Sequence, residues 1–252
     1  MTKLYIILPV LGFLVGGIVI SLGGGGAAFF LSILTGVGHL SASSAAATSL
    51  FVGLPALMVG SYSHWRTGNM CFHEGNQMLI AALPSTIIGS LVAKYIPETI
   101  YSWIIFIIFI LLGVQMLLQS FHRNTPVKNK THRSGMTYVF GILSGLMVGI
   151  AGLSGGGPLV AGLLLIGLTM QQAAATSSYV LVITSIVGLF LHATQGHTAW
   201  GMGAVLMIGA LLGSAIAPRF LSRLNPQKVT LVLRPIMGLF LILMGLKLVI
   251  HL

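Results

Sequence analysis

The chain has 252 residues, of which 56% are hydrophobic and only 6% are charged, and its mean hydropathy is +1.03. Soluble domains carry about 25% charged residues, so this composition excludes a water-soluble globular protein and predicts an all-α polytopic membrane protein. The net charge of +10 comes from Lys and Arg residues that stand singly or in short loop clusters between apolar spans. This pattern is typical of the positive-inside bias rather than of nucleic-acid binding.

Apolar segments of about 20 residues, the length of one transmembrane helix, recur along the whole chain. They cover residues 4–22, 43–63, 77–96, 99–120, 136–153, 173–193, 199–218 and 229–250. Two shorter apolar segments, 27–38 and 158–168, are too short to cross a bilayer comfortably. Each of them predicts a broken or re-entrant helix. We expect the first segment to be mature structure, because no A-x-A cleavage pattern follows it.

The same order of motifs occurs twice along the chain. SLGGGGAAFF, SAAATS and His64 with Gly68 in the first half correspond to LSGGGPLVAG, QAAATSS and His192 with Gly196 in the second half. The two Ala-Thr-Ser motifs and the two histidines are each separated by 128 residues. An internal duplication in an apolar chain is typical of secondary transporters, in which the substrate site lies between the two halves.

The predicted organisation is a first transmembrane repeat over residues 1–120, a basic linker over 121–134 and a second repeat over 135–252. The linker carries Arg123, Lys128, Lys130 and Arg133 and is predicted to be cytoplasmic. If the short segments count as crossings, each half has five crossings and the second half is inverted. If they turn back, each half has four crossings and the halves are parallel. The charge distribution favours the inverted 5+5 arrangement.

The chain contains few residues that could carry catalysis or bind a metal. Its two acidic residues, Glu74 and Glu98, fall in or beside loops, and Cys71 is the single cysteine. Carriers of protons and cations commonly bury carboxylates along the path, so this composition favours an anion as the substrate. We expect no enzyme activity, no catalytic residue, no metal site and no cofactor.

Two glycine runs, each between a long and a short helical segment, are the leading candidates for substrate binding. They consist of Gly23, Gly24, Gly25 and Gly26 in the first half and Gly155, Gly156 and Gly157 in the second half. A short helix that starts after such a run presents unpaired N–H groups and the positive end of its dipole, which suits an anion. Pro158 fits the first turn of such a helix. The alternative is that the glycines allow neighbouring helices to pack closely.

Polar side chains recur at equivalent places in both halves. Thr48, Ser49, Thr176 and Ser177 could donate hydrogen bonds to a bound oxyanion, or could bond a carbonyl one turn back or join two helices. His64 and His192, each four residues before a glycine, could take part in proton-linked transport, or could be interfacial side chains. Trp65, Trp103 and Trp200 stand at segment ends and indicate anchors at the membrane interface.

The doubled pattern of a glycine run, a short apolar stretch, A-x-x-A-A-A-T-S and a span that closes on His and Gly resembles the TauE/SafE, or sulfite exporter, family of bacterial membrane permeases. The resemblance covers nearly the whole chain and is strongest at LSGGGP and QQAAATSS; the first half has Ala27 where the second has Pro158. It implies a multi-pass protein of the bacterial inner membrane that exports sulfite, sulfoacetate or a related small anion.

The sequence therefore predicts a secondary transporter of a small anion that works by alternating access between two repeats. An anion channel and a non-transporting membrane scaffold are the alternatives. The expected partners are the lipid bilayer and the anionic substrate, with no nucleic acid. The exact anion, the coupling ion, the direction of transport and the oligomeric state are left open, and a homodimer is one option.

Overall fold

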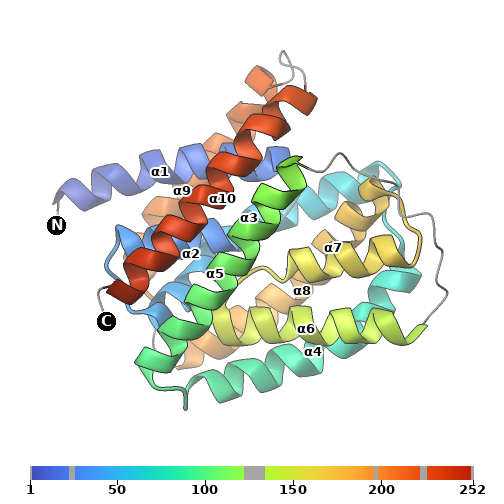
Figure 1. Cartoon of the computed structure of the whole chain (residues 1–252), viewed down its shortest axis with the longest axis horizontal. Coiled ribbons are helices and arrows are strands. Elements are labelled where there is room, and N and C mark those ends of the chain that lie inside the picture. The colour runs from blue at the N-terminus through green and yellow to red at the C-terminus, as the bar shows by residue number, and fades with distance from the viewer. Residues whose placement is uncertain (1, 23–25, 122–133, 196–197, 222–225, 251–252) are drawn as a thin grey trace.

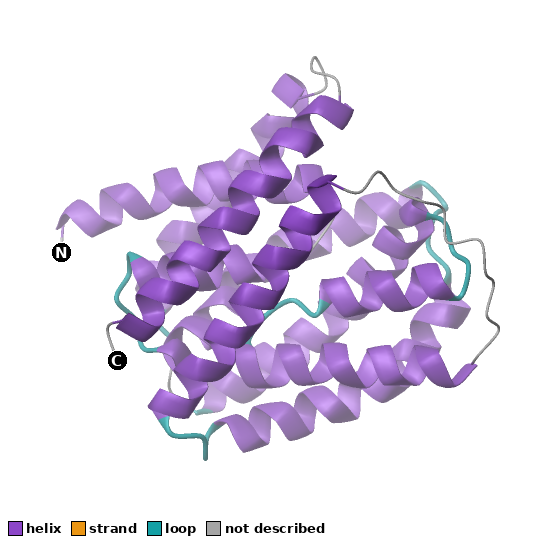
Figure 2. Ribbon diagram, viewed as in Figure 1, coloured by secondary structure: helices purple, strands orange, loops and turns teal. Residues whose placement is uncertain are grey.

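The computed structural model describes the backbone of residues 2–22, 26–121, 134–195, 198–221 and 226–250. Within these ranges the chain forms ten α-helices and no strand (Figure 2), which confirms the predicted all-α class. A segment that crosses a bilayer has to satisfy its backbone hydrogen bonds internally, and this requirement favours helices in such an apolar chain. Of the predicted linker, only its two end residues belong to the described part of the chain.

The helix boundaries agree closely with the apolar segments of the sequence. The first half contains α1 (Thr2–Leu22), α2 (Ala27–Gly36), α3 (Ala42–Arg66), α4 (Phe72–Ala93) and α5 (Glu98–Phe121). The second half contains α6 (Ser134–Ala151), α7 (Gly156–Leu165), α8 (Met170–Thr194), α9 (Trp200–Leu221) and α10 (Pro226–Ile250). Helix α4 begins several residues before the predicted range, because its first turn is polar and a hydropathy pattern does not recognise it.

The ten helices differ in how far they could reach across a membrane. Four described helical stretches are long and apolar enough to span a bilayer, namely Ala42–Arg66, Phe72–Ala93, Glu98–Leu118 and Met170–Thr194. Helices α2 and α7 have 10 residues each. At ~1.5 Å per residue they are ~15 Å long, about half of the ~30 Å hydrocarbon core. Both match the two segments that were predicted to be too short to cross.

Helix α7 turns back along α6, so that the two form an antiparallel pair that we call the α6–α7 hairpin (Figure 1). A Cβ added to Gly155 would overlap Ser144, whereas a Cβ added to Gly162 would contact the Phe140 side chain. The partner number falls as the α7 number rises, which is the signature of an antiparallel pair. The second short helix is therefore a half-length segment that returns toward the end at which α6 begins.

Glycines let two pairs of helices approach until their backbones touch. On α1, a Cβ at Gly12 would overlap the carbonyl oxygen of Leu206, and one at Gly16 would overlap that of Ala210. Successive turns of α1 therefore meet successive turns of α9, and the two helices run in the same direction. Such small-residue contacts are the usual way to pack helices in lipid, where burial of apolar surface gives little driving force.

Helices α4 and α6 pack in the same manner. A Cβ at Gly145 would overlap the carbonyl oxygen of Ala82, and one at Gly149 would overlap that of Thr86. These helices also run in the same direction, and they lie side by side in Figure 1. The close packing that the sequence offered as the alternative role of the glycine runs thus occurs at glycines of α1 and α6 that precede the runs. It also occurs at Gly155 of the second run, where a Cβ would overlap the backbone of Ser144.

The molecule has a centre of buried helices and an exterior of apolar side chains. All ten residues of α2 are buried, and α3 packs against both α2 and α8. Large apolar side chains such as Ile80, Phe190 and Ile250 are at least 66% exposed. An exterior of this kind is suited to lipid rather than water. Trp65, Trp103 and Trp200 are also exposed, consistent with their predicted place at the membrane interface.

Candidate functional site

The turn between α6 and α7 brings the second glycine run into the interior of the bundle. Gly152, at the start of this turn, has a φ of +61°, and a Cβ there would overlap the backbone of Ala46 on α3. Only glycine fits such a close approach in the left-handed region without strain. The turn is therefore pressed against α3, and the N-terminus of α7 starts beside that contact.

The first turn of α7 begins without a capping side chain. Gly155 is its N-cap residue, makes no side-chain cap hydrogen bond and accepts a bond from the Leu159 N–H at 3.3 Å. Gly155 and Gly156 are buried. The first amides of a helix have no partner inside the helix, so the amides of this turn are donors for another group. Pro158 has no N–H and leaves no orphan donor at its position.

The first glycine run can be described only at its last residue. Gly26 is the N-cap residue of α2, and its carbonyl accepts from the amides of Phe29 and Phe30 at 3.0 and 3.2 Å. Gly23, Gly24 and Gly25, which were also predicted to bind the substrate, lie outside the described residues. Both short helices therefore begin at a buried glycine that lacks a capping side chain.

The two predicted threonines accept hydrogen bonds from the backbone amides of residues that precede helices of the opposite half. The Oγ1 of Thr48 accepts from the Ala199 N–H at 3.0 Å and donates to the Ser44 carbonyl at 2.7 Å. The Oγ1 of Thr176 accepts from the Cys71 N–H at 3.0 Å. Because Ala199 and Cys71 immediately precede α9 and α4, each threonine acts as an N-cap for a helix of the other half.

The two predicted serines differ in what they contact. The Oγ of Ser49 lies 2.9 Å from the carbonyl of Ala46 and 3.0 Å from that of Gly152, so it joins α3 to the turn before α7. The Oγ of Ser177 donates to the carbonyl of Ala174, one turn back in its own helix, at 3.0 Å. The Ser49 hydroxyl therefore contacts the α6–α7 hairpin, whereas the Ser177 hydroxyl bonds within its own helix.

The two predicted histidines have unlike surroundings. His192 is 3% exposed, and its Nε2 lies 2.9 Å from the Gly149 carbonyl on α6. His64 lies near the end of α3 with part of its surface exposed, and its carbonyl accepts from the Thr67 hydroxyl at 2.9 Å. His192 thus links two helices of the second half, whereas His64 stands at the end of a span.

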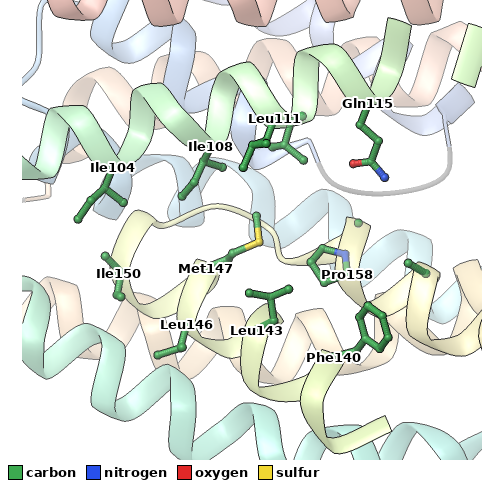
Figure 3. Close-up of a pocket in the computed structure, with 13 residues that line it drawn as sticks. Ile104, Ile108, Leu111, Gln115, Phe140, Leu143, Leu146, Met147, Ile150 and Pro158 are labelled. Carbon is green, nitrogen blue, oxygen red and sulfur yellow. The ribbon is translucent and has the colours of Figure 1, made fainter. Parts of the chain in front are cut away.

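An apolar cavity of about 460 Å³ lies between α5, α6 and α7 (Figure 3). Its volume falls in the ~300–1,000 Å³ range of small-molecule sites. Gly157 and Pro158 of α7 line it, and Gln115 of α5 is the polar side chain of its wall. The rest of the wall is formed by Ile104, Ile108, Leu111, Leu112, Phe140, Leu143, Leu146, Met147, Ile150 and Ala161. The predicted glycine run therefore borders a cavity that suits the apolar part of a molecule.

Several buried hydroxyls that the sequence did not single out lack partners. Among the described residues these are the hydroxyls of Ser90, Ser144, Ser154, Ser185 and Thr198. Ser154 directly precedes the second glycine run, and Ser144 faces the N-cap of α7. For Ser154 the signal was its place in LSGGGP, but nothing local in the sequence indicates where Ser144 points.

A smaller polar cavity of about 330 Å³ contains Glu98 and Lys247. The Glu98 carboxylate accepts from the first amides of α3, Ala42 and Ser43, and from the Ser43 hydroxyl at 2.9 Å. Lys247 donates to the carbonyl of Gly36 at the end of α2, at 2.6 Å. Both side chains thus neutralise helix ends, the negative one at an N-terminus and the positive one at a C-terminus. Glu98, one of the two acidic residues, therefore has a structural role at the start of α3.

Comparison with known proteins adds independent information. The family model described as "Sulfite exporter TauE/SafE" matches residues 8–248. The chain is similar to "Probable membrane transporter protein YunE" of Bacillus subtilis (strain 168), with 25% identity over 97% of each chain. It is also similar to "Probable membrane transporter protein MJ0441" of Methanocaldococcus jannaschii, with 23% identity over 94% of this chain and 95% of the relative.

The match of the family model covers almost the whole chain, including all ten helices apart from a few end residues. It agrees with the helical spans and with the apolar exterior, which together describe a multi-pass membrane protein. The chain therefore belongs to the TauE/SafE sulfite exporter family of membrane transporters.

Proposed function

We propose that the chain is a secondary transporter that exports a small anion, such as sulfite or an organosulfonate, by alternating access between two inverted repeats. The observation that carries this proposal is the buried, uncapped N-terminus of α7, where a polar helix end faces the interior of a membrane protein. A helix N-terminus has a partial positive charge and free N–H donors, both of which favour an anion. The family description, which names sulfite, supports the same substrate class.

The acidic residues support an anion rather than a cation. Glu98 is bound to the start of α3, and Glu74 lies in the first turn of α4. Both sit at helix starts, where carboxylates stabilise the helix dipole, rather than deep in a span. A cation path in lipid usually needs buried carboxylates, because an uncompensated charge in the membrane is costly.

The helix boundaries support two homologous repeats. Helices α3 and α8 begin at residues 42 and 170 and both contain 25 residues, and α4 and α9 begin at 72 and 200 and both contain 22. The starting residues in each pair are separated by 128, the offset of the Ala-Thr-Ser motifs. The N-caps Ser41 and Thr169 keep the same offset, and each accepts from the amide three residues later.

Contacts between the halves recur with that same offset. The pair formed by Thr48 and the Ala199 amide corresponds to Thr176 and the Cys71 amide. Ring pairs follow the rule too: Phe51 contacts Trp200 at 5.0 Å between centroids, and Tyr179 contacts Phe72 at 5.5 Å. Two copies of one unit that exchange equivalent contacts in this way are expected to form a transporter with a site at their interface.

The directions of packing support inversion of the second repeat. Helix α9 begins beside Thr48, near the start of α3, whereas α4 begins beside Thr176, near the start of α8. Since α1 runs with α9 and α6 runs with α4, the two halves begin at opposite ends of the bundle. We call the end at which α5 ends and α6 begins the linker end. The positive-inside rule then favours a cytoplasmic linker in a bacterial inner membrane.

The test is counterflow in proteoliposomes that contain the purified protein. If the protein is a carrier, proteoliposomes preloaded with unlabelled sulfite should transiently accumulate labelled sulfite, because each protein molecule returns to the outside-facing state with substrate bound. A channel would equilibrate the label without such an overshoot, and a scaffold would give no flux above that of empty liposomes. The same measurement with methanesulfonate in place of sulfite examines whether the transporter accepts organic anions.

A further inference from the structure

We infer that the hydroxyls of Ser144 and Ser154, together with the first amides of α7, bind the oxygen atoms of a compact oxyanion head group of the sulfite or sulfonate type. This inference rests on the proposed function, because it adds two binding residues to the site at the α7 N-terminus. Neither serine was among the predicted site residues, although Ser154 belongs to the LSGGGP motif.

Both serines have hydrogen-bonding capacity that the protein leaves unused. Ser144 is 0% exposed and Ser154 is 6% exposed, and within the described structure neither hydroxyl has a hydrogen-bond partner. Buried polar groups in proteins are nearly always paired, and an orphan group is usually completed by a water molecule, an ion or a ligand. Two orphan hydroxyls beside the same uncapped helix start therefore indicate a bound polar group.

Most buried hydroxyls in this bundle do not share this property. Ser32, Thr86 and Ser178 each donate to a carbonyl three or four residues back in their own helix, at 2.7 to 2.9 Å. Back-bonding of this kind is the default for Ser and Thr in an apolar helix. Ser144 lies within α6, where the same bond is open to a side chain at that position, but its Oγ points toward α7 instead.

The three other orphan hydroxyls lack the second feature of the site. Ser90 lies near the end of α4, and Ser185 lies in the middle of α8. Thr198 lies before α9, but the first amide there is already bound to Thr48. Only at Ser144 and Ser154, within the described part of the chain, do orphan hydroxyls coincide with a helix start that no side chain caps.

The Ser144 hydroxyl lies against the α7 N-terminus, and Ser154 is next to that N-terminus in the chain. The Ser144 oxygen faces Gly155 so closely that a Cβ there would overlap it. Ser154 is joined directly to Gly155, and the amides of Gly156 and Gly157 follow. Hydroxyls and amides are neutral donors, and an oxyanion with three oxygens on one centre needs several of them around a compact charge.

The neighbouring cavity defines the rest of the ligand. Gly157 and Pro158 belong both to the first turn of α7 and to the wall of the 460 Å³ apolar cavity. A sulfonate bound at the helix start thus has room for an apolar group on its carbon side. We therefore expect short alkanesulfonates to bind at least as tightly as sulfate, which has no such group and carries two charges.

The experiment measures methanesulfonate and sulfite binding to the purified full-length protein by calorimetry and by ligand-induced thermal stabilisation. The variants are Ser144→Ala, Ser154→Ala and the double substitution, with Ser178→Ala as the matched control, because its buried hydroxyl already donates to Ala175. The double variant is expected to bind at least tenfold more weakly, while its melting temperature without ligand stays the same or rises. The control is expected to bind like the wild type.

Each outcome separates this inference from the proposed function. If the wild type binds neither anion, the proposed function fails. If the wild type binds and the double variant binds equally well, the proposed function stands and the inference is overturned. Ser154→Thr retains the hydroxyl and is expected to keep most of the affinity. Loss of binding in this variant, with an unchanged melting temperature, would also overturn the inference.

Discussion

Thr48 and Thr176 illustrate how one hydroxyl can serve the fold where the sequence suggests a ligand. Each oxygen is buried and accepts a hydrogen bond from the residue that precedes a helix of the other half. An acceptor at that position satisfies an amide that would otherwise be buried without a partner. Their predicted role in substrate binding stays a prediction. The Thr176 oxygen accepts from a backbone amide and can still donate its proton, whereas the Thr48 hydroxyl already donates to the Ser44 carbonyl.

Replacement of Thr176 by Val is expected to lower the free energy of unfolding by about 1 kcal/mol, within the ~0.5–2 kcal/mol range for loss of a cap. The Cys71 amide would lose its acceptor, while the shape of the side chain would be nearly preserved. Thr184→Val is the control on the same helix, because the Thr184 hydroxyl donates only to carbonyls of α8. Thermal unfolding in detergent measures both variants, and equal melting temperatures for all three proteins would contradict the capping role.

Transport by the double variant Thr48→Val/Thr176→Val then separates the two roles. A cap that only positions α4 and α9 predicts a lower melting temperature with a nearly unchanged KM for the anion. A hydroxyl that binds the substrate predicts a raised KM, with or without a loss of stability. Proteoliposome flux at several sulfite concentrations measures the KM directly.

Whole helices in this protein are held together through glycines as much as through large side chains. In α6, Gly145 and Gly149 bring the backbone onto α4, and Gly155 at the start of α7 brings it back onto α6. Because apolar burial is weak as a driving force in lipid, such close approach supplies the packing energy. The position of the α6–α7 hairpin, and with it the candidate site, depends on these contacts.

A single methyl group is therefore expected to have opposite effects at two helical glycines. Gly145→Ala would press a Cβ into the Ala82 carbonyl and is expected to cost about 1–3 kcal/mol, as for other overpacked sites. Gly60→Ala on α3 meets nothing within 4 Å and is expected to stabilise the helix by ~0.5–1 kcal/mol. Melting temperatures of the two variants give the comparison. An undiminished melting temperature for Gly145→Ala would show that α4 and α6 do not pack as described.

At the scale of the whole molecule, the end of the helix bundle at which a loop lies decides which side of the membrane that loop faces. The loop between α3 and α4 is at the linker end, and the loop between α4 and α5 is at the opposite end. Thr67 and Tyr95 are exposed residues of these two loops. With a cytoplasmic linker, Thr67 would face the cytoplasm and Tyr95 the outside.

Cysteine labelling in intact cells examines this orientation. In a Cys71→Ser background, which removes the single native cysteine, Thr67→Cys and Tyr95→Cys form a matched pair. We expect a membrane-impermeant maleimide to label the Tyr95→Cys variant in intact spheroplasts, and the Thr67→Cys variant only after permeabilisation. The reverse pattern would mean that the linker is outside, and labelling of both from one side would contradict an α4 that spans the membrane.

The sequence alone determined the helical class, the helix positions and the two short segments, because a bilayer demands about 20 apolar residues for each crossing and a pattern of that length is visible locally. Family motifs around Gly155–Gly157 and Thr176 were also visible in this way. Only the tertiary structure decided what each polar side chain contacts. Whether Thr48 meets an amide of α9, or Ser144 meets Gly155, depends on contacts between helices that local patterns do not encode.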